Sequence, residues 1–201
     1  MDELIIALQQ DNLAKIKSLC KKGIDLKEPI TIGLEYDLED YDQVSVLFYA
    51  IRYQASIEAI ELLLECGADI YEIDEDGLSA IDIAIKFKRE DVVKLCIEKG
   101  MDVNKTSRKS KINPLLLASC FNNVDIVKLL LDNGADINYI DNYGMNAKDY
   151  ARKLGQKKVL EFLEKEGAKH NLYKDDKVEK KNEFSLKNRE KPSEDMGFDS
   201  I

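Results

Sequence analysis

The sequence predicts an all-α solenoid, a stack of about five helix-turn-helix units. Two series of small residues repeat along the chain with nearly the same period. The alanines are spaced by 34, 34 and 33 residues and the glycines by 33, 34 and 33, at Ala50, Ala84, Ala118 and Ala151 and at Gly67, Gly100, Gly134 and Gly167. A period of this length is typical of stacked repeats, in which each unit buries its apolar face against its neighbours.

The most regular unit spans residues 113–140. Asn113 can cap a first helix, and Pro114 stands where a first-turn proline is tolerated. A second helix follows, with apolar residues at helical spacing from Val124 to Leu131, and Gly134 ends it. A single pair of such helices cannot bury its apolar faces, so this unit needs copies on either side.

The junctions between units resemble the ankyrin repeat over about residues 1 to 168. The segments that carry this resemblance are GADIYEIDEDGLSAIDIA, GMDVNKTSRKSKINPLLLA and GADINYIDNYGMNAKDYA. The resemblance implies that β-turn loops, called fingers in this family, join the units. Two departures stand out. Ser45, Ser79, Asn113 and Asn146 replace the family's capping threonine, and Phe48, Asp82, Leu116 and Asp149 replace its histidine.

The extent of the repeats divides the chain into a repeat domain, residues 1–168, and a tail. The segment 28–43 contains six acids and no base, and its partial alternation of apolar and polar residues favours an enlarged first finger shaped as a hairpin. The tail is rich in charge and poor in apolar residues, which predicts disorder. The predicted parts are an N-terminal capping repeat 1–27, the enlarged acidic finger 28–43, repeats 44–73, 74–106 and 107–140, a C-terminal capping repeat 141–168, and the disordered tail 169–201.

Composition limits the partners and the compartment. A net charge of −9 and a pI near 4.8 argue against nucleic acid as a partner. No apolar run has the length of a membrane span, and the acidic start lacks the basic region of a signal peptide. Four cysteines without a C-x-x-C pair indicate reduced thiols in a cytoplasmic protein, and a disulfide framework is not expected. We also expect a monomer.

Catalytic chemistry finds no support in the pattern of residues. The one histidine, His170, lies in the tail, which leaves the repeats without a histidine for a triad or a metal site. The glycines are dispersed at junctions and form no phosphate-binding loop. We therefore expect no catalytic residue, no metal and no cofactor.

The family resemblance implies that a protein partner binds the concave surface made by fingers and first helices. The ends of the first helices carry one large apolar residue per unit. This apolar stripe is either a surface anchor or packing between units, and its members are Tyr53, Phe87, Phe121 and Leu154. The later fingers differ in charge: finger 2 (residues 71–76) is acidic, finger 3 (105–111) contains Lys105, Arg108, Lys109 and Lys111, and finger 4 (139–143) carries two tyrosines. The candidate binding residues are Tyr36, Tyr41, Arg52, Tyr53, Glu75, Asp76, Lys86, Phe87, Lys109, Phe121, Tyr143 and Leu154.

These observations predict a non-catalytic interaction module that acts as an adaptor, inhibitor or accessory factor. The Lys-, Ile- and Asn-rich composition favours a bacterial origin, and this leaves an alternative open: an effector delivered into a host cell, or an immunity protein that neutralises a toxin. An enzyme is the interpretation that the sequence supports least.

Overall fold

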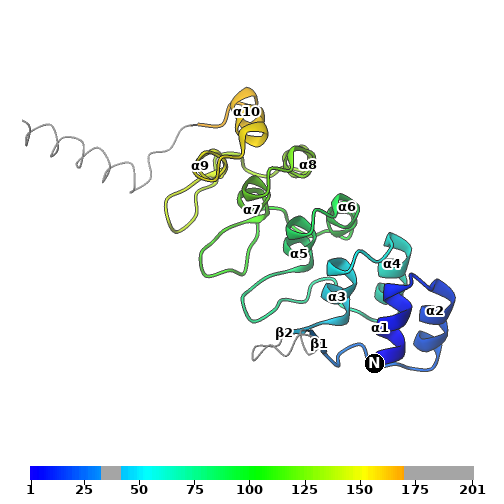
Figure 1. Cartoon of the computed structure of the whole chain (residues 1–201). Coiled ribbons are helices and arrows are strands. Elements are labelled where there is room, and N and C mark those ends of the chain that lie inside the picture. The colour runs from blue at the N-terminus through cyan, green and yellow to red at the C-terminus, as the bar shows by residue number, and fades with distance from the viewer. Residues whose placement is uncertain (33–41, 170–201) are drawn as a thin grey trace, which may run out of the picture.

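A computed structural model describes residues 1–32 and 42–169 of the chain. These residues form five successive helix pairs and one short hairpin (Figure 1). The helices are α1 (Asp2–Gln9), α2 (Leu13–Lys21), α3 (Val46–Arg52), α4 (Ile57–Glu65), α5 (Ala80–Lys86), α6 (Glu90–Glu98), α7 (Pro114–Cys120), α8 (Val124–Asp132), α9 (Ala147–Lys153) and α10 (Lys157–Lys165). The all-α solenoid is confirmed.

The helices lie in two rows. Figure 1 shows α3, α5, α7 and α9 in an inner row from which the fingers extend to the same side, and α4, α6, α8 and α10 in an outer row. We call the surface made by the fingers and the ends of the inner helices the finger face. The four periodic alanines are fully buried in the inner row, where a larger side chain would separate neighbouring units.

The inner helices begin at polar N-cap residues. The side-chain oxygens of Ser45 and Asn113 accept hydrogen bonds from the backbone N–H three residues later, at 3.1 and 3.0 Å. In α5 the Asp82 carboxylate accepts from both the N–H and the hydroxyl of Ser79, at 3.0 and 2.7 Å. Asp149 makes the matching contact with Asn146 at 3.1 Å. In two units, aspartates at the family's histidine position therefore close capping boxes.

The predicted hairpin is present in the enlarged finger. Strands β1 (Ile30–Ile32) and β2 (Asp42–Val44) pair antiparallel, with Ile30 opposite Val44 and Ile32 opposite Asp42. The candidate residues Tyr36 and Tyr41 lie outside the described residues.

The last helix pair presents a polar end to the stack. Lys148 and Glu164 form an ion pair at 3.1 Å. The residues 33 positions earlier, in α7 and α8, are Leu115 and Leu131, and Leu115 is fully buried under the next unit. Charged residues at these positions cover the end of the apolar core, as expected of a capping repeat. The described chain stops at Lys169, whose N–H donates to Asn138 at 3.1 Å, so the predicted disorder of the tail concerns residues outside the described part.

The expectation of four reduced thiols is wrong for one pair. Cys20, at the end of α2, and Cys66, which follows α4, form a disulfide with their Cα atoms 5.7 Å apart. The two cysteines are 46 residues apart in sequence and become neighbours only because α2 packs along α4. The prediction of a cytoplasmic location rested partly on reduced thiols, and the disulfide removes that support. None of the helices in the described part of the chain is long and apolar enough to cross a membrane.

Candidate functional site

A groove of about 750 Å³ opens on the finger face between the enlarged finger and finger 2. We call it the N-terminal groove. Its walls come from the hairpin strand β2, the helices α3 and α5, and finger 2. The lining residues are Lys27, Pro29, Gln43, Val44, Ser45, Phe48, Arg52, Glu72, Ile73, Asp74, Glu75, Asp76, Leu78, Ile83, Lys86 and Phe87.

Buried apolar residues lie beneath the groove, and most of the exposed residues in its walls are charged, although the apolar Ile73 is 52% exposed. Phe48 and Ile83 belong to the buried core and show only an edge to the groove. The Arg52 guanidinium lies 5.7 Å from the centre of the Phe87 ring, a cation–π distance. Gln54 donates to the Phe87 carbonyl at 3.3 Å, so the ends of α3 and α5 are tied together. An apolar base with a polar rim is the arrangement of a protein-binding surface.

Finger 2 supplies the acidic wall. Asp74 is used within the turn, where one carboxylate oxygen accepts from the N–H of Asp76 at 3.0 Å and of Leu78 at 2.7 Å. That turn holds Glu75 and Asp76 at the exposed tip. Glu72, lower in the wall, accepts a hydrogen bond from the Ser45 hydroxyl. Burial raises the pKa of Glu72 above its ordinary value, while the bond from Ser45 acts in the opposite direction.

Five of the candidate residues line this groove together: Arg52, Glu75, Asp76, Lys86 and Phe87. They come from three segments of the chain, α3, finger 2 and α5. The other eleven lining residues were not among the candidates; Gln43, Val44, Phe48 and Glu72 are four of them. Phe48 had a usable signal, because it replaces the family's histidine at the start of an inner helix.

The remaining candidate residues in the described part of the chain lie elsewhere on the finger face. Tyr53 is 46% exposed and its ring stacks on Tyr49, with centroids 4.2 Å apart. Leu154 is 51% exposed, whereas Phe87 and Phe121 are half-buried against the core. The apolar stripe is therefore mixed: its two ends are exposed, and its two middle members are half-buried and pack against the core. Tyr143 and Lys109 are exposed on fingers 4 and 3.

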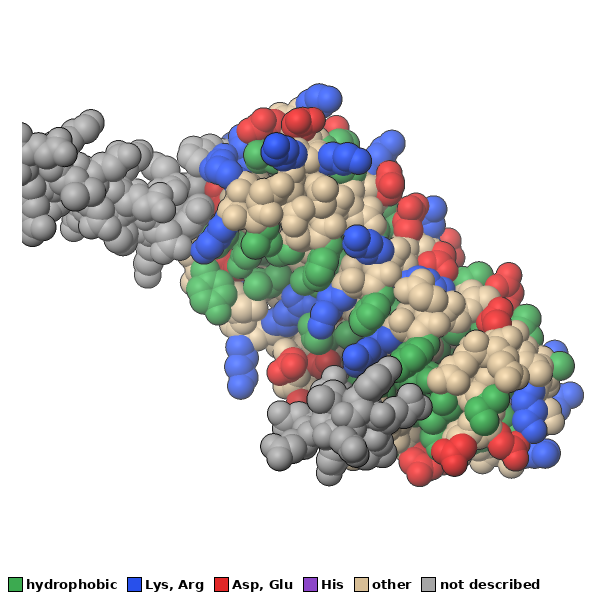
Figure 2. Space-filling model, viewed as in Figure 1, with side chains coloured by type: hydrophobic (Ala, Val, Ile, Leu, Met, Phe, Trp, Pro, Cys, Tyr) green, Lys and Arg blue, Asp and Glu red, His purple; other side chains and the backbone are tan. Residues whose placement is uncertain are grey.

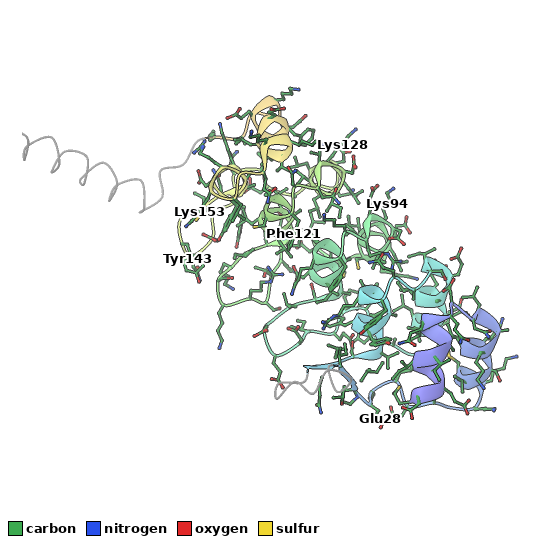
Figure 3. All side chains as sticks on the ribbon, in the orientation of Figure 1. Glu28, Lys94, Phe121, Lys128, Tyr143 and Lys153 are labelled. Atoms are coloured by element: carbon green, nitrogen blue, oxygen red, sulfur yellow. A yellow bond between two sulfur atoms is a disulfide. The ribbon has the colours of Figure 1, made fainter. Side chains whose placement is uncertain are left out.

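Figure 2 shows hydrophobic side chains beside Lys and Arg side chains across the finger face. In Figure 3, Phe121 lies at the end of α7 and Tyr143 on finger 4, whereas Lys94 and Lys128 lie on the outer helices α6 and α8.

Arg108 corrects the prediction of finger 3 as a loop of four surface cations. Its side chain is buried, with 8% of the residue exposed, and its guanidinium nitrogen lies 3.0 Å from a carboxylate oxygen of Asp82. Fingers 2 and 4 carry Asp74 and Asp141 at the corresponding position, where the side chain turns inward. An arginine there meets the carboxylate that replaced the family's histidine, and the two charges compensate each other.

The described residues contain no group of three or more His, Cys, Asp or Glu side chains placed to hold a metal ion. The two free cysteines are poor nucleophiles because burial raises the pKa of Cys96 to about 12 and of Cys120 to about 11.

A stack of helix pairs with fingers on one side and a grooved finger face defines a repeat scaffold. The family model for ankyrin repeats in three copies matches residues 4–107 and 83–174, and the chain belongs to the ankyrin repeat family. It is also 31% identical over 98 residues to the putative ankyrin repeat protein FPV244 of Fowlpox virus (strain NVSL). That match covers 49% of this chain and 13% of the viral protein. Ankyrin repeats are generally protein-interaction modules.

Proposed function

We propose that this protein is a non-catalytic adaptor, inhibitor or accessory factor that binds one protein partner along the finger face. The N-terminal groove is the main contact. The observation that carries this proposal is the convergence of Arg52, Lys86 and Phe87 with the acidic tip of finger 2 around one apolar-based groove.

Charge on the two walls favours a partner segment that carries both signs. Lys86 and Arg52 lie on the helix side, and Glu75 and Asp76 lie on the finger side. Complementary charges across an interface increase the association rate and disfavour wrong partners. The apolar base formed by Phe87 and its neighbours would provide most of the affinity.

The polar end of the stack supports a protein that works as a single copy. Lys148 and Glu164 occupy positions where an internal unit would present apolar residues. Stacking of a second chain on this end would desolvate an ion pair without burying apolar surface, which is unfavourable.

A charge swap across the groove tests the proposal. Glu75→Lys combined with Lys86→Glu keeps the net charge and reverses one of the two charges on each wall. Asp125→Lys combined with Lys128→Glu is the matched control, since both residues are exposed on the outer helix α8. Each variant and the wild type are used as bait in native lysate, and bound proteins are quantified by mass spectrometry.

The expected result is one protein enriched by the wild type and by the control pair, and lost with the groove pair. Equal enrichment by all three baits would contradict the role of the groove. Circular dichroism on each bait confirms that the variants are folded.

A further inference from the structure

Fingers 3 and 4 form a second surface on the finger face, beyond the N-terminal groove. We call it the basic surface and define it by Lys109, Lys111, Phe121, Tyr143 and Leu154. Both lysines are exposed, Tyr143 is 61% exposed and Phe121 is half-buried at the end of α7. The surface therefore combines positive charge, which attracts a partner of opposite charge, with aromatic side chains of the kind that anchor protein interfaces.

The charge that this region exposes is positive because its acids are turned inward. Asp141 is buried and accepts from the N–H of Tyr143 at 2.9 Å and the hydroxyl of Tyr150 at 2.6 Å. Asp149 is fully buried within its capping box. Lys109 and Lys111 form no ion pair with any residue in the described part of the chain. On a chain of net charge −9, these two exposed cations belong to one finger.

Hydrogen bonds between neighbouring units fix this surface. Asn142 of finger 4 donates from its backbone to the Ser110 carbonyl at 3.1 Å and from its side chain to the Lys109 carbonyl at 2.7 Å. Gln156 donates to the Cys120 carbonyl at 2.7 Å and so connects the ends of α7 and α9. A preorganised surface loses little conformational entropy on binding.

We infer that the basic surface binds an acidic segment of a protein partner, with an aliphatic or aromatic side chain of that segment against Phe121 and Tyr143. This inference rests on the proposed function of the finger face. It adds the charge of the partner segment and the orientation of the partner along that face. The tip of finger 2 carries Glu75 and Asp76, so an acidic segment is repelled there and attracted two units later. The partner therefore lies with its acidic part over fingers 3 and 4.

The probe for this inference is a fluorescein-labelled peptide of about 12 residues, built from Glu, Ser and two Leu, followed by fluorescence anisotropy at low salt. A peptide with Lys in place of Glu, one with Ser in place of Leu, and an oligonucleotide of similar charge serve as comparison ligands. The protein variants are Lys109→Glu/Lys111→Glu, Tyr143→Ala, and the control Lys94→Glu/Lys128→Glu. The two double variants change the net charge equally, but Lys94 and Lys128 lie on the outer helices (Figure 3).

We expect the wild type to bind the acidic leucine peptide. Lys109→Glu/Lys111→Glu should weaken binding by about tenfold or more, because like charges then face each other, and the control pair should bind as the wild type within about twofold. Tyr143→Ala, or removal of the leucines, should weaken binding several-fold. The groove pair Glu75→Lys/Lys86→Glu should retain the peptide, which separates failure of this inference from failure of the proposed function.

Three results would overturn the inference. The first is equal loss in both double lysine variants, which would mean that net charge alone governs binding. The second is binding of the lysine peptide as tightly as the glutamate peptide. The third is preference for the oligonucleotide over the acidic peptide.

Discussion

Removal of the Arg108 side chain is expected to destabilise the protein strongly, although finger 3 lies at the surface. The Arg108→Ala variant leaves the Asp82 carboxylate, whose residue is only 2% exposed, without its cation 3.0 Å away. Loss of one partner from a buried ion pair typically costs about 3–5 kcal/mol. Asp82 keeps its two hydrogen bonds from Ser79, so we expect the lower end, about 3 kcal/mol.

Urea denaturation followed by circular dichroism measures this loss. Lys109→Ala, at the adjacent exposed position, is the control and should change the free energy of unfolding by no more than about 0.5 kcal/mol. Burial already raises the pKa of Asp82, and Arg108 partly opposes that rise. Without Arg108 the folded-state pKa rises further above the ordinary value of 3.8, so the variant should regain stability as the pH falls toward that value.

The next unit of the chain carries a different pair of residues at these two positions, without a buried ion pair. Leu116 and Asp141 occupy the corresponding positions one unit later. Asp82→Leu combined with Arg108→Asp copies them, and an aspartate at position 108 can accept turn N–H groups as Asp74 and Asp141 do. The double variant should lie within about 1.5 kcal/mol of the wild type. A cost below about 1 kcal/mol for Arg108→Ala, or a double variant as unstable as the single one, would refute the reasoning.

Further outcomes follow from the disulfide, a free thiol and a close backbone contact. Replacing Cys20 and Cys66 by serine should lower the free energy of unfolding by about 4 kcal/mol, from the entropy of closing a loop of 46 residues, and a reductant should have no further effect on that variant. Cys120, with a pKa of about 11, should be alkylated very slowly at pH 8 in the native protein and rapidly in urea. Gly77→Ala would place Cβ 2.8 Å from the backbone of finger 3. Gly134→Ala is the control, because its Cβ would have nothing within 4 Å and the two glycines share only the positive φ. Urea denaturation should therefore show a loss of unfolding free energy that is larger for Gly77→Ala by about 1–3 kcal/mol.

The fold could be predicted from the sequence because the residues that repeat, alanine and glycine, each have one structural role. Ala84 and Ala118 are fully buried where inner helices meet, and Gly100 and Gly134 adopt positive φ after outer helices. Each unit uses the same helix caps, buried alanine and terminal glycine, so a structure inferred for one junction supports the same structure at the next. The hairpin of the enlarged finger was indicated by the partial alternation of apolar and polar residues in segment 28–43, and strands β1 and β2 pair there.

The candidate site was only partly predictable because it depends on contacts between units. Arg52, Lys86 and Phe87 were found from their position in the repeat, and the structure places them in one groove. Arg108 was misassigned because charge alone does not show whether a side chain turns toward solvent or toward Asp82. The Cys20–Cys66 disulfide was missed for a related reason: spacing within a repeat does not show which residues of neighbouring outer helices lie opposite each other.

The central claim, that a protein partner occupies the N-terminal groove, is tested most directly by photocrosslinking. A photoreactive amino acid replaces Lys86 in the groove or, as the control, Lys128 on the outer helix α8. Each protein is irradiated in native lysate with and without excess wild-type protein, and the products are identified by mass spectrometry. The account predicts one crosslinked protein from position 86, suppressed by the wild-type competitor and absent from position 128. No competed product from position 86, or the same product from both positions, would contradict it.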